Sequence, residues 1–315
     1  MRKALIVGID NYPSCPLSGC VNDATEMKSV LERNSDGSPN FSVKLMTSND
    51  LTITRSNLKQ EIDSLFEGDP DIALLFFAGH GTVSSYGGHI VTTDFKKYDE
   101  GVSMDDILNL ANKSKAKNRI IILDCCYSGN MGSPNLTDGK YAELADGVTV
   151  LTACRPTETS SEQNGQGVFT ALLIDALQGV CSDLTGNISP GSVYAYVDRA
   201  LGPWAQRPVF KTNVSRFVSL RSVTPPIETA ILRNITKYFA SAYDDYKLDP
   251  SFEDTEADAN TENVKVFKEL QKMESVGLVK PVGEEHMYYA ALNSKSCKLT
   301  ALGMQYWNLV TSGNI

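Results

Sequence analysis

"IIILDCCYSG" (residues 120–129) joins a run of apolar residues to an acid, two adjacent cysteines and, further on, a glycine. An unbroken apolar run is typical of a strand that is covered on both faces. Asp124, Cys125 and Cys126 follow where such a strand would end. In parallel α/β sheets, functional sites lie at the carboxyl ends of the strands. The stretch therefore predicts a parallel sheet with a thiol-containing site at one edge.

Similar apolar runs recur along the first two thirds of the chain, with helical patterns between them. The predicted strands cover residues 4–9, 72–79, 119–124 and 148–153. The predicted helices cover residues 22–33, where Asn22 would be the cap, and residues 55–67, 103–114 and 167–179. Alternating strands and helices predict an α/β fold, with a mainly parallel sheet and helices on both faces.

The pattern changes at Pro225 and Pro226, so we predict two domains, 1–222 and 223–315. The second would contain a helix (264–275), a hairpin-like pair (278–282 and 287–292) and a last helix (299–309). Helices followed by a two-stranded wing and another helix predict a small winged-helix-like α+β domain.

Composition limits the classes of partner and the location. The 315 residues are 42% hydrophobic and carry a net charge of −9, which argues against a general affinity for nucleic acid or anionic membranes. No apolar run approaches the roughly 20 residues that span a bilayer. The apolar run near the start is too short for a signal peptide, so we expect a cytoplasmic protein. Its seven cysteines are then expected to be free thiols.

A histidine also stands at the end of a predicted strand. "FFAGHG" places His80 about 46 residues before the thiol pair, at the same edge of the sheet. A histidine beside a thiol can take its proton, and the thiolate can then attack a carbonyl carbon. Taken singly, a buried cysteine is usually a small hydrophobic residue and a strand-end histidine is usually just hydrogen-bonded. The two motifs together favour a catalytic pair.

The chain resembles the caspase-like cysteine peptidases of clan CD, and most closely their metacaspase and prokaryotic branch. The resemblance spans roughly residues 1–220 and rests on "KALIVGIDNY", "LSGCVNDA", "LLFFAGHG", "RIIILDCCYSG", "VTVLTACRPTETSSE" and "GVFTALLIDAL". It implies the caspase–haemoglobinase fold and endopeptidase activity without an organic cofactor. Cys126 matches the nucleophile and His80 the base, although Tyr127 stands where the family usually has His. The resemblance also implies an oxyanion hole formed by the Gly81 and Cys126 amides.

Two acids suggest the residue after which the peptide would be cut. Asp124 lies two positions before Cys126, so both side chains should share one face of the strand. A carboxylate there would attract a basic P1 side chain, and the resemblance pairs it with Asp23 of "LSGCVNDA", where Cys20 also matches. We therefore predict cleavage after Arg or Lys. Alternatively, Asp23 would be an ordinary acid in the first turn of a helix, and Asp124 would cap a loop. Ala78 stands where the family often has an S1 serine.

The resemblance suggests two further features, a calcium site and self-processing. Asp94, Asp105 and Asp106 fall at plausible positions for a calcium site, although the adjacent pair would also suit a solvated helix start. Lys140 is the only basic residue in the glycine-rich stretch between residues 127 and 147. Such a stretch is easily cleaved, so we predict self-processing after Lys140.

The second domain carries nine Lys or Arg and thirteen Asp or Glu between residues 225 and 315, a net charge of −4. Nucleic-acid binding needs clustered positive charge, so a protein partner is favoured over DNA. The resemblance suggests a role in stress response, regulated cell death or antiviral defence. Two other classes stay open: a catalytically silent scaffold that acts through this domain, and a nucleotide-binding regulator. The sequence has no Gly-rich phosphate loop, which argues against the nucleotide-binding regulator.

Overall fold

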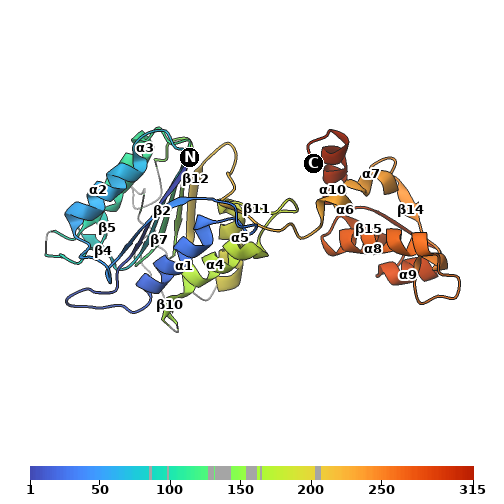
Figure 1. Ribbon diagram of the computed structural model, residues 1–315, viewed down its shortest axis with the longest axis horizontal. Helices are drawn as coiled ribbons and strands as arrows, with labels where there is room; N and C mark the ends of the chain where they lie inside the picture. The colour runs from blue at the N-terminus through green and yellow to red at the C-terminus, as the bar shows by residue number, and fades with distance from the viewer. Residues whose placement is uncertain are drawn as a thin grey trace. The chain divides into compact units, whose positions relative to one another are not determined.

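The computed structural model describes residues 1–84, 87–97, 99–126, 131, 143–153, 162–163, 165–202 and 207–315. The chain divides into two compact units (Figure 1). One comprises Met1–Ser182 and Asn187–Thr224, and the other comprises Asp183–Gly186 and Pro225–Ile315. The division therefore falls two residues after the boundary expected from the sequence, and it assigns four residues of an earlier segment to the second unit.

The first unit is built on a six-stranded sheet with the order β12-β8-β7-β3-β1-β2. Its strands are β1 (Arg2–Gly8), β2 (Ser42–Thr47), β3 (Ile72–Ala78), β7 (Asn118–Asp124), β8 (Val148–Thr152) and β12 (Val209–Asn213). Five strands run parallel, and only β12 pairs in the antiparallel direction, with β8. The mainly parallel α/β sheet predicted from the sequence is confirmed.

Helices cover both faces of this sheet (Figure 1). On one face lie α1 (Cys20–Glu32), α4 (Val168–Asp175), its π-helical extension (Ala176–Val180) and α5 (Pro190–Leu201); on the other lie α2 (Arg55–Phe66) and α3 (Met104–Lys113). Alternate residues of β1 divide between the two cores. Leu5 and Val7 pack with the α2/α3 side, whereas Ala4 and Ile6 pack with the α1/α4 side. We refer to these below as the α2/α3 face and the α1/α4 face.

Short strands complete the first unit. An antiparallel sheet of β4 (Gly81–Ser84), β5 (Gly87–Ile90) and β6 (Val102–Ser103) follows β3 directly. β9 (Glu162–Gln163) pairs with β10 (Gln166–Gly167), immediately before α4. β11 (Asn187–Ile188) pairs with β13 (Arg221–Ser222).

Helix α1 begins two residues earlier than expected, and Asn22 is not its cap. The helix starts at Cys20, and its first amides are bound by a carboxylate from the preceding loop. Asp10 accepts hydrogen bonds from the amides of Cys20, at 2.8 Å, and Val21, at 3.2 Å. An acid at the N-terminus of a helix accepts hydrogen bonds from the free amides, and its negative charge interacts favourably with the helix dipole. The contact ties the loop after β1 to α1.

Arg119, at the start of β7, holds several loops together at the amino end of the sheet. Its side chain is 6% exposed and donates to the carbonyls of Ala111, Ala116 and Asp146 at 3.0, 2.6 and 2.7 Å. Arg119→Met would keep most of the aliphatic stem but leave these buried carbonyls without donors. We expect the substitution to lower the free energy of unfolding by about 3 kcal/mol.

Thermal unfolding of the full chain would measure this effect, with Lys115→Met as the control. Lys115 belongs to the same segment but is exposed, so its replacement should change stability by less than about 0.5 kcal/mol. Equal thermal unfolding midpoints for the two variants would show that the hydrogen bonds from Arg119 to these loops do not stabilise the fold.

The second unit combines short helices with a three-stranded sheet of order β14-β16-β15. Its elements are α6 (Thr229–Arg233), α7 (Ile235–Tyr238), β14 (Asp245–Lys247), the 3-10 turn Pro250–Phe252, α8 (Thr261–Ser275), β15 (Val279–Val282), α9 (Met287–Leu292), β16 (Ser296–Leu299) and α10 (Ala301–Thr311). The hairpin prediction was wrong in one part: residues 287–292 form a helix. The strand that pairs with β15 comes next, at Ser296.

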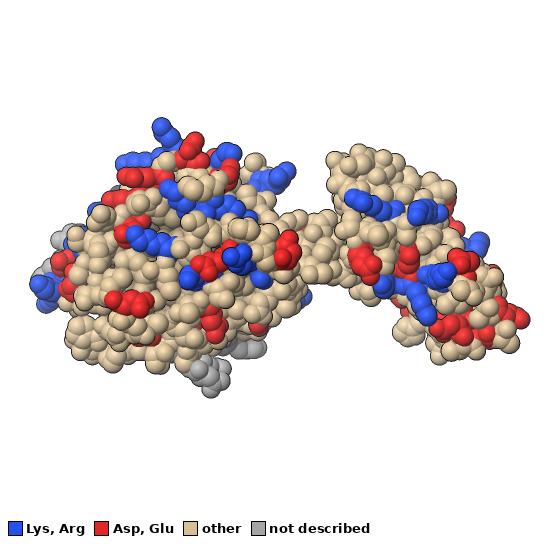
Figure 2. Space-filling model, viewed as in Figure 1, with Lys and Arg blue, Asp and Glu red and all other residues tan. Residues whose placement is uncertain are grey.

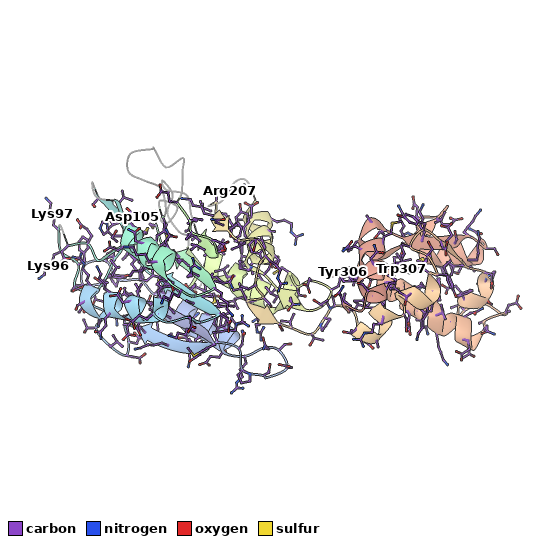
Figure 3. The ribbon with its side chains drawn as sticks, turned by 90° about the horizontal axis from the view of Figure 1, so that it is seen from above. Lys96, Lys97, Asp105, Arg207, Tyr306 and Trp307 are labelled. Atoms are coloured by element: carbon purple, nitrogen blue, oxygen red, sulfur yellow. The ribbon has the colours of Figure 1, made fainter. Side chains whose placement is uncertain are left out.

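The core of the second unit explains this difference. Met287, Ala290 and Ala291 are buried, and their spacing of three and four residues suits one side of a helix. The last helix is fixed by Trp307, whose indole nitrogen donates to the carbonyl of Phe239 at 2.7 Å (Figure 3). Classification of the unit as a winged helix stays a prediction.

Charges of both signs are interspersed on the face of the second unit that Figure 2 shows. The lysines on α8 are drawn into ion pairs with acids. Lys265 contacts Glu262 at 2.8 Å, Lys268 contacts Asp254 at 3.0 Å, and Lys272 contacts Glu228 at 3.2 Å. All three lysines are exposed, so each pair contributes little to stability. The acids neutralise the lysines of α8, so this helix does not offer the clustered positive charge that binding to a nucleic-acid backbone needs.

Cys297 on β16 provides a test of the second core. It is fully buried, and burial, followed by the nearby Asp245 and Glu274, raises the pKa of its thiol to about 12. The thiolate fraction falls tenfold for each pH unit below the pKa, so at pH 8 almost all of this thiol is protonated. We expect iodoacetamide at pH 8 to modify the exposed Cys15 and to spare Cys297 until the protein is unfolded. Peptide mass spectrometry would check this; equal rates in the native protein would contradict the burial.

Candidate active site

The two motifs that suggested a catalytic pair lie at the same edge of the central sheet. β3 and β7 pair in register, with Ala78 opposite Asp124 at their carboxyl ends. The pairing continues one step further, where the Gly79 amide donates to the Asp124 carbonyl at 3.2 Å. His80 comes two residues after Ala78, and Cys126 comes two residues after Asp124. The two residues therefore lie at the same level beyond the paired strand ends.

Gly81 brings the two chain segments into direct contact. A Cβ atom placed on Gly81 would lie 2.1 Å from the carbonyl oxygen of Cys126 and 3.1 Å from the Cys125 sulfur. No side chain fits in that space, so the close approach requires glycine. Cys125 is 1% exposed and belongs to the core of the α2/α3 face, whereas Cys126 is half-buried. Of the two thiols, Cys126 is the one that can be reached from outside.

The imidazole of His80 is held by groups from the loop after β1. Its Nε2 lies 2.7 Å from the carbonyl oxygen of Cys15. A carbonyl can only accept, so this bond places a proton on Nε2 and leaves Nδ1 of the neutral ring as an acceptor. The Tyr12 ring lies 4.6 Å from the His80 ring, and its hydroxyl accepts a hydrogen bond from the His80 amide at 3.0 Å. His80 is thus fixed in both position and tautomer.

The two predicted S1 acids converge on one glycine of the α1/α4 face. A Cβ atom on Gly167 would lie 2.5 Å from Oδ2 of Asp124 and 2.9 Å from Oδ2 of Asp23. The Gly167 amide donates to both carboxylate oxygens of Asp23, at 3.2 and 3.1 Å. The Thr170 hydroxyl donates to Oδ2 of Asp124 at 2.7 Å. Two carboxylates from α1 and β7 therefore meet at the start of α4.

Both acids are almost completely buried: Asp23 is 2% exposed and Asp124 6%. Two carboxylates taken out of water are costly unless hydrogen bonds or a cation compensate them. Their position next to the reachable thiol suits a site that receives a cationic side chain. Ala78 is fully buried in the core of the same face, and Cys20, at the start of α1, packs against that core. Ala78 is paired with Asp124 across the two strands, and Cys20 lies three residues before Asp23 on α1.

The three acids suggested as calcium ligands are engaged separately. Asp94 accepts from the Arg55 amide at 3.0 Å and the Thr92 hydroxyl at 2.6 Å. Burial opposes its ionisation, but these bonds together hold the pKa of Asp94 below its ordinary value. Asp106 pairs with Lys59 at 3.2 Å. Burial raises the pKa of Asp105, which Figure 3 labels on α3, and the neighbouring Asp106 adds to the effect.

Among the described residues, no group of three or more His, Cys, Asp or Glu side chains is arranged to hold a metal ion. Calcium wants six or more oxygen ligands. Asp94, Asp105 and Asp106 therefore do not fit a calcium ion by themselves.

The cleavage site predicted at Lys140 lies outside the described residues. In the same described part of the chain, no helix is long and apolar enough to cross a membrane.

Several residues that shape this site were missed from the sequence. Cys15 acts through its backbone carbonyl, for which residue type gives no signal. Gly167 and Thr170 stand in "GQGVFT", for which the sequence predicts a substrate-side loop and a helix start but not the contacts with the two acids. Tyr12 could have been suspected, because a tyrosine close after an apolar strand lies at the edge where His80 was expected.

The fold and the edge site define a caspase-like α/β protein. Residues 1–218 match the family model described as the caspase domain. This is more than half of the chain, and the chain belongs to the caspase domain family, whose members are cysteine peptidases. None of the curated proteins compared with the chain matches it.

Solved structures show the same fold at low sequence identity. Protein GSU0716 from Geobacter sulfurreducens is similar with a TM-score of 0.53 and 18% identity, over 71% of this chain and 100% of that one. Caspase-1 from Spodoptera frugiperda is similar with a TM-score of 0.50 and 14% identity, over 71% of this chain and 91% of that one. At these identities the likeness establishes the fold and leaves the chemistry to the residues themselves.

Proposed function

We propose that the chain is a cysteine endopeptidase of the metacaspase type, with Cys126 as nucleophile and His80 as base, cleaving after Arg or Lys. The observation that carries the proposal is the convergence of Asp23 and Asp124 on Gly167, beside the edge at which Cys126 and His80 follow paired strands. A thiol, a fixed imidazole and an anionic pocket are the parts that such a reaction needs.

In the proposed reaction, Nδ1 of His80 takes the proton of the Cys126 thiol. The thiolate attacks the carbonyl carbon of the P1 residue and forms a C–S bond, while the amides of Gly81 and Cys126 would stabilise the oxyanion. The C–N bond then breaks as His80 protonates the leaving amine. Water hydrolyses the resulting thioester, returning the free thiol. The bond from Nε2 to the Cys15 carbonyl keeps the imidazole turned for these transfers.

The P1 preference is proposed from electrostatics. An Arg or Lys side chain entering beside Cys126 would meet the carboxylates of Asp23 and Asp124, and a planar guanidinium could bridge two acids. An acidic P1 side chain would be repelled by the same charges. The substrates are accordingly expected to be polypeptides with a basic residue before the scissile bond.

Other parts of the proposal lie further from the site. Residues 225–315 would bind a protein partner that regulates the peptidase, because the lysines of α8 are paired with acids. The activity would serve a stress, cell-death or antiviral defence pathway and take place in the cytoplasm. Self-processing after Lys140 would appear as a cut in wild-type protein that Cys126→Ala lacks. Calcium dependence would require oxygen ligands in addition to Asp94, Asp105 and Asp106.

The experiment that tests the proposal is a P1 profile. Fluorogenic peptides with Arg, Lys, Asp or Leu at P1 would be incubated with the full chain, with calcium and with chelator. Cleavage after Arg and Lys is expected. Cleavage after Asp would overturn the pocket assignment, and the absence of any cleavage would favour the silent scaffold.

A further inference from the structure

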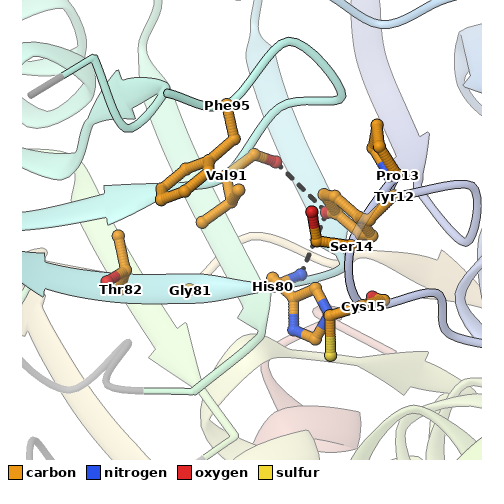
Figure 4. A pocket seen from close by; sticks show the side chains of 9 residues that line it. All are labelled: Tyr12, Pro13, Ser14, Cys15, His80, Gly81, Thr82, Val91 and Phe95. Carbon is orange, nitrogen blue, oxygen red and sulfur yellow. Dashed lines mark hydrogen bonds between the residues drawn. The ribbon is translucent and has the colours of Figure 1, made fainter. Parts of the chain in front are cut away.

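A cavity of about 290 Å³ opens beside His80 (Figure 4). It lies within the part of the chain that the structure describes, and its lining includes Tyr12, Pro13, Cys15, His80, Val91 and Phe95. The volume is at the small end of the range for ligand pockets, which suits one side chain rather than a large ligand.

The lining of this cavity is apolar. None of the described residues that line it is an Asp, Glu, Lys or Arg. The hydroxyl of Tyr12 is fully engaged: it donates to the Val91 carbonyl at 3.1 Å and accepts from the His80 amide. Burial raises the pKa of Tyr12 well above its ordinary value, so the ring is presented as a neutral surface. Phe95, which also lines the cavity, is 50% exposed. Its aromatic ring is therefore accessible to a side chain that enters the cavity.

The cavity and the acid pair belong to opposite faces of the sheet. Asp23, Asp124 and Gly167 gather on the α1/α4 face, whereas Tyr12 and Val91 belong to the core of the α2/α3 face. His80 follows the strand end between them and lines the cavity itself. In the proposed reaction His80 protonates the leaving amine. The residue that carries this amine, P1′, must therefore lie on the His80 side, away from the P1 pocket.

We propose that this cavity is the S1′ pocket and that it selects a bulky apolar residue, such as Leu or Phe, directly after the cleaved bond. The inference rests on the proposed peptidase function and adds a second determinant of its specificity. Burying a Leu side chain in the cavity should raise kcat/KM by about 10-fold over Gly. None of the described residues that line the cavity is a Lys or Arg, so an acidic P1′ residue should be disfavoured relative to Leu.

Two measurements on the full chain test the pocket. Peptides with Arg at P1 and Gly, Leu, Phe or Asp at P1′ would be compared by mass-spectrometric rates, and the ratio of Leu to Gly is the readout. Phe95→Ala should lower this ratio about 3-fold or more. Val83→Ala is the matched control, because Val83 is 47% exposed on β4 but does not line the cavity, and its ratio should stay at the wild-type value.

A binding measurement separates failure of the pocket from failure of the peptidase. Cys126→Ala protein would be titrated with the Leu and Gly peptides, and the Leu peptide is expected to bind about 10-fold more tightly. Equal affinities, including no measurable binding of either peptide, would overturn the S1′ assignment whether or not the wild type cleaves. Cleavage after Arg with a flat P1′ profile would overturn it while leaving the peptidase intact.

Discussion

Cys126→Ala is expected to lower kcat/KM for Arg-P1 peptides by at least about 1000-fold. The substitution removes the sulfur that would form the acyl-enzyme, and the remaining parts of a site rarely compensate for a missing nucleophile. His80→Ala should cost a similar factor, because the thiol would lose its base and the leaving amine its acid. The double variant should be little worse than either single one, since the two residues act as a unit. Steady-state rates on peptides provide the measurement.

The neighbouring thiol is the matched control. Cys125→Ala makes the same chemical change one residue earlier, but Cys125 is 1% exposed and packs in the core of the α2/α3 face. It should retain activity within about 3-fold, with a modest loss of stability. If Cys125→Ala were the inactive variant and Cys126→Ala the active one, the assignment of the nucleophile would be wrong.

The second large effect concerns charge in the P1 pocket. Asp124→Asn is expected to lower kcat/KM for Arg-P1 peptides on the order of 100-fold, the usual cost of removing one partner of a buried charge pair. Asparagine keeps the shape, and its amide oxygen can still accept from Thr170, so the loss would report charge rather than packing. Asp23→Asn should act in the same way, since its amide oxygen can still accept from Gly167.

Citrulline makes this test specific. It has nearly the shape of arginine and no charge, so the ratio of Arg to citrulline cleavage isolates the electrostatic part. That ratio should collapse in Asp124→Asn and in Asp23→Asn. Glu32→Gln changes a partly exposed acid on the same helix as Asp23 and should leave the ratio unchanged. An unchanged ratio in both pocket variants would show that the acid pair does not bind the P1 side chain.

The sheet could be predicted because its central strands are buried on both faces. β3 and β7 read as unbroken apolar runs, and the structure ends them within a residue of the predicted positions. The edge strand β2 was missed, because Ser42 and Lys44 are exposed and its run is neither fully apolar nor long. Helix α5 was also missed, although Ser189 and Ser192 form a capping box and Pro190 is the first residue of the helix. That signal was present in the sequence.

The site could be predicted only as far as residue types carry chemistry. His80 and Cys126 were placed by strand ends, and the register of β3 with β7 brings their positions to the same level. The meeting of Asp23 with Asp124 at Gly167 depends on how α1 and α4 pack, which no local pattern specifies. The carbonyl of Cys15 is a backbone group with no signature at all. In the second unit, residues 287–292 alternate too weakly to distinguish a strand from a helix, and burial of their helical side decided the outcome.

The most direct test of the catalytic assignment is covalent capture. A peptidyl acyloxymethyl ketone with Arg at P1 would be incubated with the full chain, and the adduct located by tandem mass spectrometry, which separates adjacent cysteines. The account predicts one adduct, on the Cys126 sulfur, that is lost in His80→Ala and slower with citrulline at P1. Capture at the exposed Cys15, or no adduct on Cys126 in folded protein, would contradict it.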